Sequence, residues 1–350
     1  MNEIEYLSLG YERKKTLFEK DWVPKAVPFV SEEQSAGMIV YCLDESVKKC
    51  IGAETKIGVF LSGGLDSSSI LHFAAKYAKV VCLSADWGDG ITNELEQAQS
   101  FAEEMSCEFV PVKINGDLDS IKEAVVAMKK QDILIADPSV VANYFLFKKA
   151  KELGLKVVLG GEGSDEFFGY TKHRLICRLA KLQPFRKVFG ALNKAVSNKY
   201  CSFLALSSEQ QFLRAVSHHY NKAIDLGFSD DYSLMANMVR YETLVQLPNY
   251  YLEASRIGTF FGIDCRSPIA ESKELAEFCL SIPDEYRMMG QKYLFKKAMV
   301  GLLPKEILQR KKRGFSIPIA VWLKNVNGET GGTVIQQWNR LVLKLWMSSN

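Results

Sequence analysis

Residues 57–68 read Ile-Gly-Val-Phe-Leu-Ser-Gly-Gly-Leu-Asp-Ser-Ser, an apolar run that passes directly into small polar residues. The apolar run Ile57–Leu61 is typical of a buried parallel strand, and Ser69–Ala78 is predicted to form a helix. A strand, a glycine-rich turn and a helix make a phosphate-binding arrangement. Gly63 and Gly64 let backbone N–H groups approach an anion, and the helix adds its positive dipole end. The sequence therefore predicts an anion site at this turn.

The side chains of this turn suit both phosphate and a metal ion. Hydroxyls at Ser62, Ser67 and Ser68 can donate to phosphate oxygens, whereas the carboxylate of Asp66 would repel them. That carboxylate is explained if it binds Mg²⁺ against the phosphates, because Mg²⁺ combines one or two carboxylates with substrate phosphates. The spacing matches neither GxxxxGK[ST] nor a GxGxxG after a strand. An ordinary turn whose Ser or Asp caps the helix is the alternative, and a second motif downstream disfavours it.

Strands and helices alternate on both sides of this turn. Apolar runs predict further strands at 80–84, 108–112 and 156–160, and helical spacing predicts helices at 93–105, 118–130 and 139–153. This alternation is typical of an α/β protein with a doubly wound parallel sheet. From Arg174 onward no strand is predicted, and helical spacing dominates, as in residues 232–251 and 272–282. We therefore expect an N-terminal arm (1–35), an α/β domain (36–173) and a mostly helical region (174–350) packed on it.

A second glycine-rich turn follows the predicted strand at 156–160. Residues 160–170 read Gly-Gly-Glu-Gly-Ser-Asp-Glu-Phe-Phe-Gly-Tyr, with carboxylates at Glu162, Asp165 and Glu166. Acids this close repel one another, and such a cluster is typical of a site that binds a cation. A solvated acidic loop that caps the next helix is the alternative. Because ligands of doubly wound sheets bind at the carboxyl ends of the strands, we expect the two turns to face one site.

Composition narrows the class of protein. The chain has 350 residues, 47% apolar and 24% charged, as is typical of a soluble globular protein. The formal net charge of +3 gives no support for nucleic-acid binding driven by charge. Eight scattered cysteines without a CxxC pair favour free thiols in a reducing compartment. With neither a signal-peptide pattern nor an apolar run of membrane-spanning length, we expect a cytoplasmic protein without a membrane partner.

The two turns together resemble the synthetase domain of the asparagine synthetase family, whose members are ATP pyrophosphatases with a Ser-Gly-Gly-x-Asp-Ser loop. The resemblance extends from roughly Ser35 to Leu323. It also includes Leu247–Tyr251 with Gly262–Pro268, and Lys292–Lys297 with Lys311–Pro318. It implies an adenine nucleotide α-hydrolase-like fold and an AMP-forming amide ligase that uses ATP and Mg²⁺. Such an enzyme adenylates a carboxylate, releases pyrophosphate and transfers the acyl group to ammonia or an amine.

The resemblance also implies roles for individual residues. Glu162 would be the general base that takes a proton from the attacking amine, and Lys312 would neutralise charge on the phosphate and the tetrahedral intermediate. Asp66 and Asp165 would bind Mg²⁺. A basic run such as 311–313 is by itself more typical of a solvated turn, but the Gly-Phe-Ser-Ile-Pro after it favours a mobile active-site loop. The residues expected to contact ATP are Leu61, Ser62, Gly63, Gly64, Asp66, Ser67, Ser84, Ala85, Gly160 and Gly161.

Two departures from the family pattern concern the substrates. The members that use glutamine begin with a nucleophilic cysteine, whereas Asn2 follows Met1 here. We therefore expect the nitrogen to come from free ammonia, an amine substrate or a separate ammonia-supplying protein. The family's Asp-Arg pair reads Ser255-Arg256, and the charge lost at Ser255 points to an acceptor other than aspartate. We assign Arg256 and Arg266 to the acceptor side.

Three functions stay open at this point. The first is amide ligation of a small-molecule or peptide carboxylate with ammonia or an amine, with an ammonia-supplying or carrier protein as a potential partner. The second is ring closure, as in β-lactam synthetases or lasso-peptide cyclases. The lactam enzymes differ at the position of Glu162, so the intact Glu-Gly-Ser-Asp-Glu favours the first function. The third is a non-catalytic nucleotide-binding partner subunit, which the presence of Asp66, Glu162, Asp165 and Lys312 disfavours.

Overall fold

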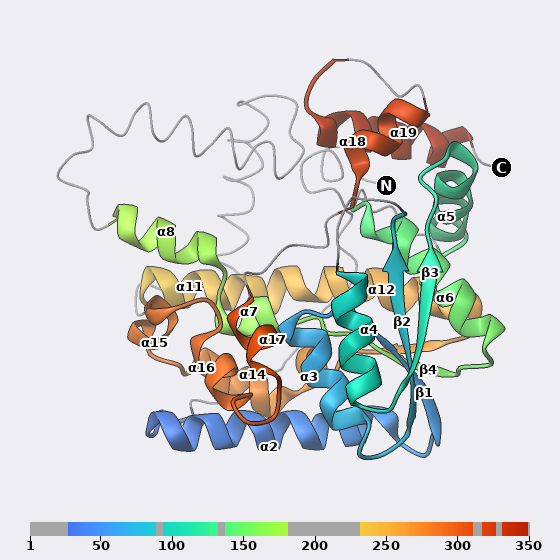
Figure 1. The fold of residues 1–350 in the computed structure, drawn as a ribbon. Helices are drawn as coiled ribbons and strands as arrows, with labels where there is room; N and C mark the ends of the chain where they lie inside the picture. Colours follow the sequence, from blue (N-terminus) through green and yellow to red (C-terminus); the bar gives the residue numbers. More distant parts are fainter. Residues whose placement is uncertain are drawn as a thin grey trace.

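The computed structural model contains a five-stranded parallel sheet (Figure 1). It describes residues 27–88, 94–131, 137–180, 232–310, 317–326 and 331–348. The strand order is β3-β2-β1-β4-β5, and all neighbouring strands are parallel. The parallel α/β class predicted from the sequence is therefore confirmed. The strands are β1 (Lys56–Phe60), β2 (Lys79–Asp86), β3 (Glu108–Lys113), β4 (Val157–Leu159) and β5 (Asp264–Arg266).

The fifth strand shows that the expectation of no strand after Arg174 was wrong. Strand β5 pairs with β4 at three positions, from Val157 opposite Asp264 to Leu159 opposite Arg266. It has a single buried residue, a cysteine, so it lacks the apolar run that reveals the other strands. The four predicted strands are confirmed to within two residues at each end.

Two helices begin earlier than the sequence suggested. Helix α2 (Glu32–Ile51) starts inside the predicted arm, because Ser31 and Gln34 form a capping box at its N-terminus. Helix α3 (Leu65–Ala74) starts directly after Gly64, so that it carries Asp66 and Ser67 in its first turn. The other described helices are α4 (Leu95–Glu104), α5 (Leu118–Lys130), α6 (Ser139–Glu152), α7 (Ser164–Phe168), α8 (Thr171–Ala180), α11 (Leu234–Tyr241), the π-helix η2 (Glu242–Gln246), α12 (Leu247–Phe261), α13 (Pro268–Glu271), α14 (Lys273–Leu280), α15 (Asp284–Met289), α16 (Tyr293–Ala298), α17 (Lys305–Gln309), α18 (Ile319–Asn325) and α19 (Val334–Ser348).

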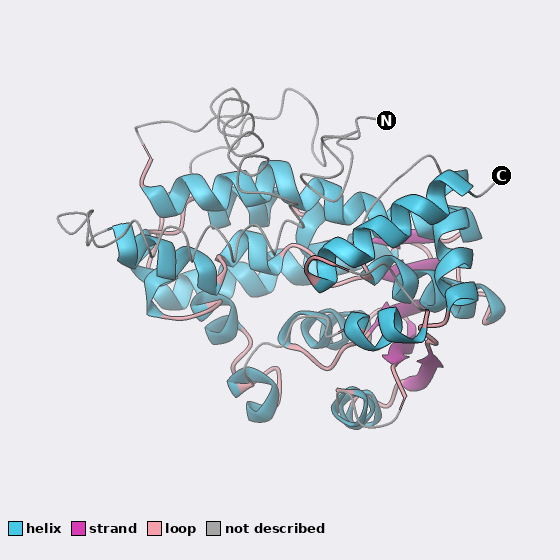
Figure 2. Ribbon diagram, turned by 90° about the horizontal axis from the view of Figure 1, so that it is seen from above, coloured by secondary structure: helices cyan, strands magenta, loops and turns pink. Residues whose placement is uncertain are grey.

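Helices cover both faces of the sheet, as Figure 2 shows from above. Successive β2 residues point to opposite faces, as the pleat of a strand requires. Val80 and Cys82 join the hydrophobic cluster formed with α2, α3, α14 and α16. Val81 and Leu83 join the cluster formed with α5, α6, α12 and α19. Helices from the C-terminal region thus contribute to both faces. Among the described residues, no helix is both long and apolar enough to cross a membrane.

Candidate active site

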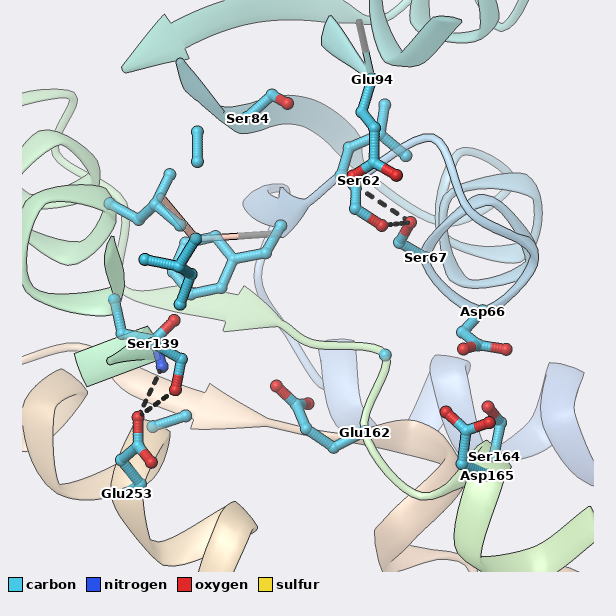
Figure 3. Close-up of a pocket in the computed structure, with 18 of the residues that line it drawn as sticks. Ser62, Asp66, Ser67, Ser84, Glu94, Ser139, Glu162, Ser164, Asp165 and Glu253 are labelled. Atoms are coloured by element: carbon cyan, nitrogen blue, oxygen red, sulfur yellow. Dashed lines mark hydrogen bonds between the residues drawn. The ribbon is translucent and has the colours of Figure 1, made fainter. Parts of the chain in front are cut away.

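A cavity of about 470 Å³ lies at the carboxyl ends of β1, β2 and β4 (Figure 3). Ser62 and Ser67 line it from the first glycine-rich turn, and Glu162 and Asp165 line it from the second. Parallel strands bring their carboxyl ends to one edge of the sheet, where ligands of doubly wound sheets bind. The structure therefore brings the two turns singled out in the sequence to one pocket.

The first turn owes its shape to one glycine and two serines. Gly63 has φ 69°, and a Cβ built there would lie 2.9 Å from the backbone nitrogen of Ala98. A side chain at this position would therefore force the backbone to shift. The Ser67 hydroxyl accepts the N–H of Ser62 at 3.1 Å and lies 3.1 Å from the Ser62 hydroxyl. The first turn of α3 follows at once, which adds free N–H groups and a positive dipole end beside the pocket.

The second turn rests against the first. Gly163 has φ 105°, and a Cβ there would lie 2.9 Å from a backbone nitrogen of α13. The hydroxyl of the buried Ser267, directly before α13, donates to the carbonyl oxygen of Glu162 at 2.9 Å and holds this turn in place. A Cβ at Gly161 would lie 3.2 Å from the backbone nitrogen of Ser67. This close approach requires a small residue and fixes the spacing between the two turns.

The side chain of Glu162 points into the pocket between the two turns (Figure 3). Its Oε2 atom is buried and has no hydrogen-bond partner among the described residues. Burial raises the pKa of the Glu162 carboxyl, and the nearby charges of Glu271 and Asp66 raise that pKa further. The carboxyl group folds back over Gly160, where a Cβ would lie 2.1 Å from Oε2. Glu162 is thus a carboxyl group with a free oxygen and an increased affinity for a proton.

The two carboxylates predicted to bind Mg²⁺ meet at a lysine that sequence reasoning gave no role. Lys292 Nζ donates to Asp66 Oδ1 at 2.8 Å and Oδ2 at 2.6 Å, and lies 3.1 Å from Asp165 Oδ1. It also donates to the Ser164 hydroxyl at 2.6 Å. Lys292 is 2% exposed and has φ 52° at the N-terminus of α16. Its place in the Lys292–Lys297 motif was the only sequence signal for this role.

Asp66 and Asp165 fit a magnesium site completed by phosphate oxygens. Both carboxylates point toward the same ammonium group, so a cation is already stabilised between them. No group of three or more His, Cys, Asp or Glu side chains among the described residues is arranged to bind a metal unaided. Two carboxylates without a full protein ligand set are typical of Mg²⁺ that arrives with a nucleotide.

Arg310 ties the C-terminal region to the first turn. Its Nη1 donates to the carbonyl oxygen of Gly63 at 3.1 Å, and its Nη2 donates to Glu94 Oε1 at 3.1 Å. Lys312, the predicted catalytic cation, falls outside the described residues. The described residues nearest to it on each side are Arg310 and Ile317, and Ile317 lines the pocket.

Most of the residues expected to contact ATP surround the pocket, but the two predicted acceptor arginines do not line it. Arg256 Nη1 donates to the carbonyl oxygen of Gln131 at 2.7 Å, at the C-terminus of α5. Arg266 pairs with Asp264 at 2.5 Å and donates to the carbonyl oxygen of Cys50 at 2.6 Å. These contacts give no support to an acceptor role. The ATP-binding candidates that line the pocket are Leu61, Ser62, Asp66, Ser67, Ser84, Ala85 and Gly161.

Comparison with known proteins agrees with this geometry. The family model described as asparagine synthase matches residues 39–338. The chain belongs to the asparagine synthase family. It is 26% identical to asparagine synthetase [glutamine-hydrolyzing] 1 of Bacillus subtilis (strain 168), over 92% of this chain and 55% of that protein. It is 25% identical to a putative asparagine synthetase [glutamine-hydrolyzing] of Mycobacterium bovis, over 87% of this chain and 52% of that protein. The chain therefore spans about half the length of these curated relatives and corresponds to an asparagine-synthetase-like synthetase domain.

Similar solved structures include two other synthetases. One is the NH₃-dependent NAD synthetase from Campylobacter jejuni, at 15% identity, with a TM-score of 0.29 over 58% of this chain and 100% of that chain. Another is an NMN synthetase from Francisella tularensis, at 20% identity, with a TM-score of 0.27 over 41% of this chain and 59% of that chain.

Proposed function

We propose that this protein is an AMP-forming, ATP-dependent amide ligase. It adenylates a carboxylate, releases pyrophosphate and transfers the acyl group to ammonia or an amine. The observation that carries the proposal is one pocket that combines a phosphate-binding turn, two carboxylates suited to Mg²⁺ and Glu162, whose Oε2 atom is buried and has no hydrogen-bond partner among the described residues. Membership of the asparagine synthase family supports the same chemistry.

In the first half-reaction a carboxylate oxygen attacks the α-phosphorus of ATP, and the bond to the leaving pyrophosphate breaks. The backbone N–H groups of the first turn and the first turn of α3 bind phosphate oxygens. Mg²⁺ bound by Asp66 and Asp165 would neutralise phosphate charge. Lys292 contacts both carboxylates, and in this proposal its ammonium group gives up one of these contacts to bind a phosphate oxygen. Lys312 is proposed as a second cation that stabilises the phosphate charge.

In the second half-reaction an amine nitrogen attacks the acyl carbon, and the bond to AMP breaks. The attacking nitrogen must lose a proton as the new bond forms. Glu162 accepts that proton at its free oxygen. Its raised pKa makes it a stronger base than an ordinary carboxylate, and a general base works best when its pKa is near the pH of the reaction.

Exchange of labelled pyrophosphate into ATP tests the proposal, because it reports adenylation without amide formation. We expect carboxylate-dependent exchange by the wild-type protein. Asp66→Asn should reduce exchange about 10-fold or more, since it removes one of two metal-binding carboxylates. Glu162→Gln should spare exchange and slow amide formation about 10²- to 10⁴-fold. If no carboxylate supports exchange in a broad screen, the proposed function is wrong. If Glu162→Gln reduces exchange as strongly as Asp66→Asn, the proposed division of roles is wrong.

A further inference from the structure

Arg310 contacts the first glycine-rich turn without lining the pocket itself. It directly follows α17, and its side chain is 20% exposed. One guanidinium nitrogen donates to the carbonyl oxygen of Gly63 and another donates to the carboxylate of Glu94, so the planar group joins two acceptors at once. Glu94 lines the pocket and directly precedes α4. Arg310 thus links the backbone of the turn to a carboxylate of the same pocket.

The peptide group between Gly63 and Gly64 can rotate more easily than most. Neither residue has a Cβ, and Gly64 has φ −84°. A half turn of this peptide group would reverse the sign of that φ angle, and glycine adopts both signs readily. The glycines that let the turn approach an anion therefore also permit a flipped peptide.

The direction of this peptide decides what the pocket offers to a phosphate. The peptide is trans, so its C=O and N–H groups point in opposite directions. The Gly63 carbonyl faces Arg310, and the Gly64 N–H points toward the Ser62 hydroxyl, at 3.4 Å, which lines the pocket. A contact of this length is weak, so a phosphate oxygen can take over the donor. A flipped peptide would present a carbonyl oxygen instead and repel the phosphate.

We infer that Arg310 is a positioning residue for ATP. Through the carbonyl oxygen of Gly63 it holds the Gly63–Gly64 peptide in the orientation that presents N–H to phosphate, and Glu94 orients the guanidinium. This inference rests on the proposed function and adds to its phosphate-binding turn a residue that acts without touching the nucleotide. The positive charge on the carbonyl side also polarises the peptide, which makes its N–H a stronger donor.

Two other roles predict different behaviour. Arg310 could serve only to neutralise Glu94, whose charge would otherwise repel phosphate, or only to hold α17 against α4. Neutralisation favours a bidentate pair of guanidinium and carboxylate. Here Nη1 binds the Gly63 carbonyl, and only Nη2 binds Glu94. This division of the donors favours the positioning role.

Binding of a nucleotide without turnover tests the inference. Calorimetric titrations use Mg²⁺ with an ATP analogue whose α and β phosphorus atoms are joined by methylene, so that adenylation is blocked. Arg310→Met keeps the apolar part of the side chain and removes both donors. We expect it to bind the analogue about 10- to 100-fold more weakly, the range for one hydrogen bond to a charged group. Arg340→Met is the matched control, because Arg340 on α19 also donates to a glycine carbonyl, that of Gly331, and it should bind as the wild type does.

The double variant Arg310→Met with Glu94→Gln separates positioning from charge. It restores the charge balance but not the contact with Gly63, so we expect its affinity to stay as low as that of Arg310→Met. The loss should also persist at high ionic strength, which screens a Coulombic effect. Arg310→Gln is a second variant in case the methionine variant does not fold, and its shorter side chain should give the same loss.

Three results would overturn the inference. Recovery of wild-type affinity in the double variant would show that Arg310 only neutralises Glu94. A loss that disappears at high ionic strength would show the same. Variants of Arg310 with a lower Tm but wild-type affinity would show a purely structural role. A wild-type protein that does not bind the analogue would refute the proposed function, and the positioning role with it.

Discussion

Replacing Lys292 by methionine removes the ammonium group shared by Asp66 and Asp165, the two carboxylates proposed to bind Mg²⁺, while most of the side-chain length remains. Lys292 is 2% exposed, and the side chains of Asp66 and Asp165 are 19% and 12% exposed. Loss of one partner from a buried ion pair typically costs about 3 to 5 kcal/mol, because the remaining charge stays buried without compensation. We expect Lys292→Met to lower the free energy of unfolding by about that amount in the presence of a chelator.

Thermal unfolding provides the assay. With an unfolding entropy of about 2.1 cal/mol/K per residue, a loss of about 3 to 5 kcal/mol in a chain of this length lowers Tm by about 4 to 7 °C. Added Mg²⁺ should recover part of the loss, since it can replace the ammonium group between the carboxylates. The double variant Asp66→Asn with Lys292→Met should lose less free energy of unfolding than the two single variants lose in total. It removes the ammonium group together with one of its two carboxylates, so Asp165 is no longer repelled by Asp66.

Lys297→Met is the matched control on the same helix. Lys297 pairs with Glu32 and Glu33 on α2, but its side chain is 33% exposed, so its loss should lower the free energy of unfolding much less than the loss of Lys292. Equal losses of Tm for the two lysine variants would refute the reasoning. So would a Lys292→Met protein whose Tm does not respond to Mg²⁺.

Three further predictions follow from the described contacts. Gly160→Ala should reduce amide formation about 10-fold or more and affect pyrophosphate exchange less, because its Cβ would displace the carboxyl group of Glu162; parallel assays of both activities check this, and equal losses would contradict it. If Glu162 is the general base, as proposed, the rate of amide formation should fall as pH decreases through its raised pKa, since a base acts only when ionised; a pH profile should lose this dependence in Glu162→Gln. Burial raises the pKa of Glu166 from an ordinary value of 4.5 to about 7. The folded state therefore binds this proton more tightly, and its stability falls as pH rises from about 4.5 to 7. Glu166→Gln should be more stable than the wild type by up to about 3 kcal/mol above pH 7, with no gain below pH 4.5, as denaturant titrations can show.

The strands nearest the pocket were predictable because each has a local signal. Val80, Val81 and Cys82 form a run that is buried on both faces of the sheet, and such a run appears in the sequence as continuous hydrophobicity. The turns were predictable because Gly63 and Gly163 adopt positive φ angles beside another backbone, which leaves a glycine signature. Strand β5 has neither signal, since three residues with one buried side chain suffice to extend the sheet at its edge.

The residues that the sequence did not reveal act over long separations. Lys292 contacts Asp66 and Ser164, which are 226 and 128 positions away in the chain. The residues that flank a lysine in the sequence do not predict which distant carboxylate it will pair with. Glu253 lies on α12, beyond the end of the helical stretch predicted at 232–251, and only the packing of α12 against α6 turns that residue toward a cavity. Arg256 is the opposite case. The arginine of the family pattern is present in the sequence and was assigned to the acceptor side, but its side chain contacts the end of α5.

Isotope transfer from substrate to AMP tests the central claim most directly. The carboxylate that gives the strongest pyrophosphate exchange is labelled with ¹⁸O in both oxygens and incubated with ATP, Mg²⁺ and the nitrogen donor under single-turnover conditions. If a carboxylate oxygen attacks the α-phosphorus and the amine then attacks the acyl carbon, the AMP produced contains one ¹⁸O atom. Label in inorganic phosphate with release of ADP, or AMP without label, would contradict adenylation and with it the proposed function.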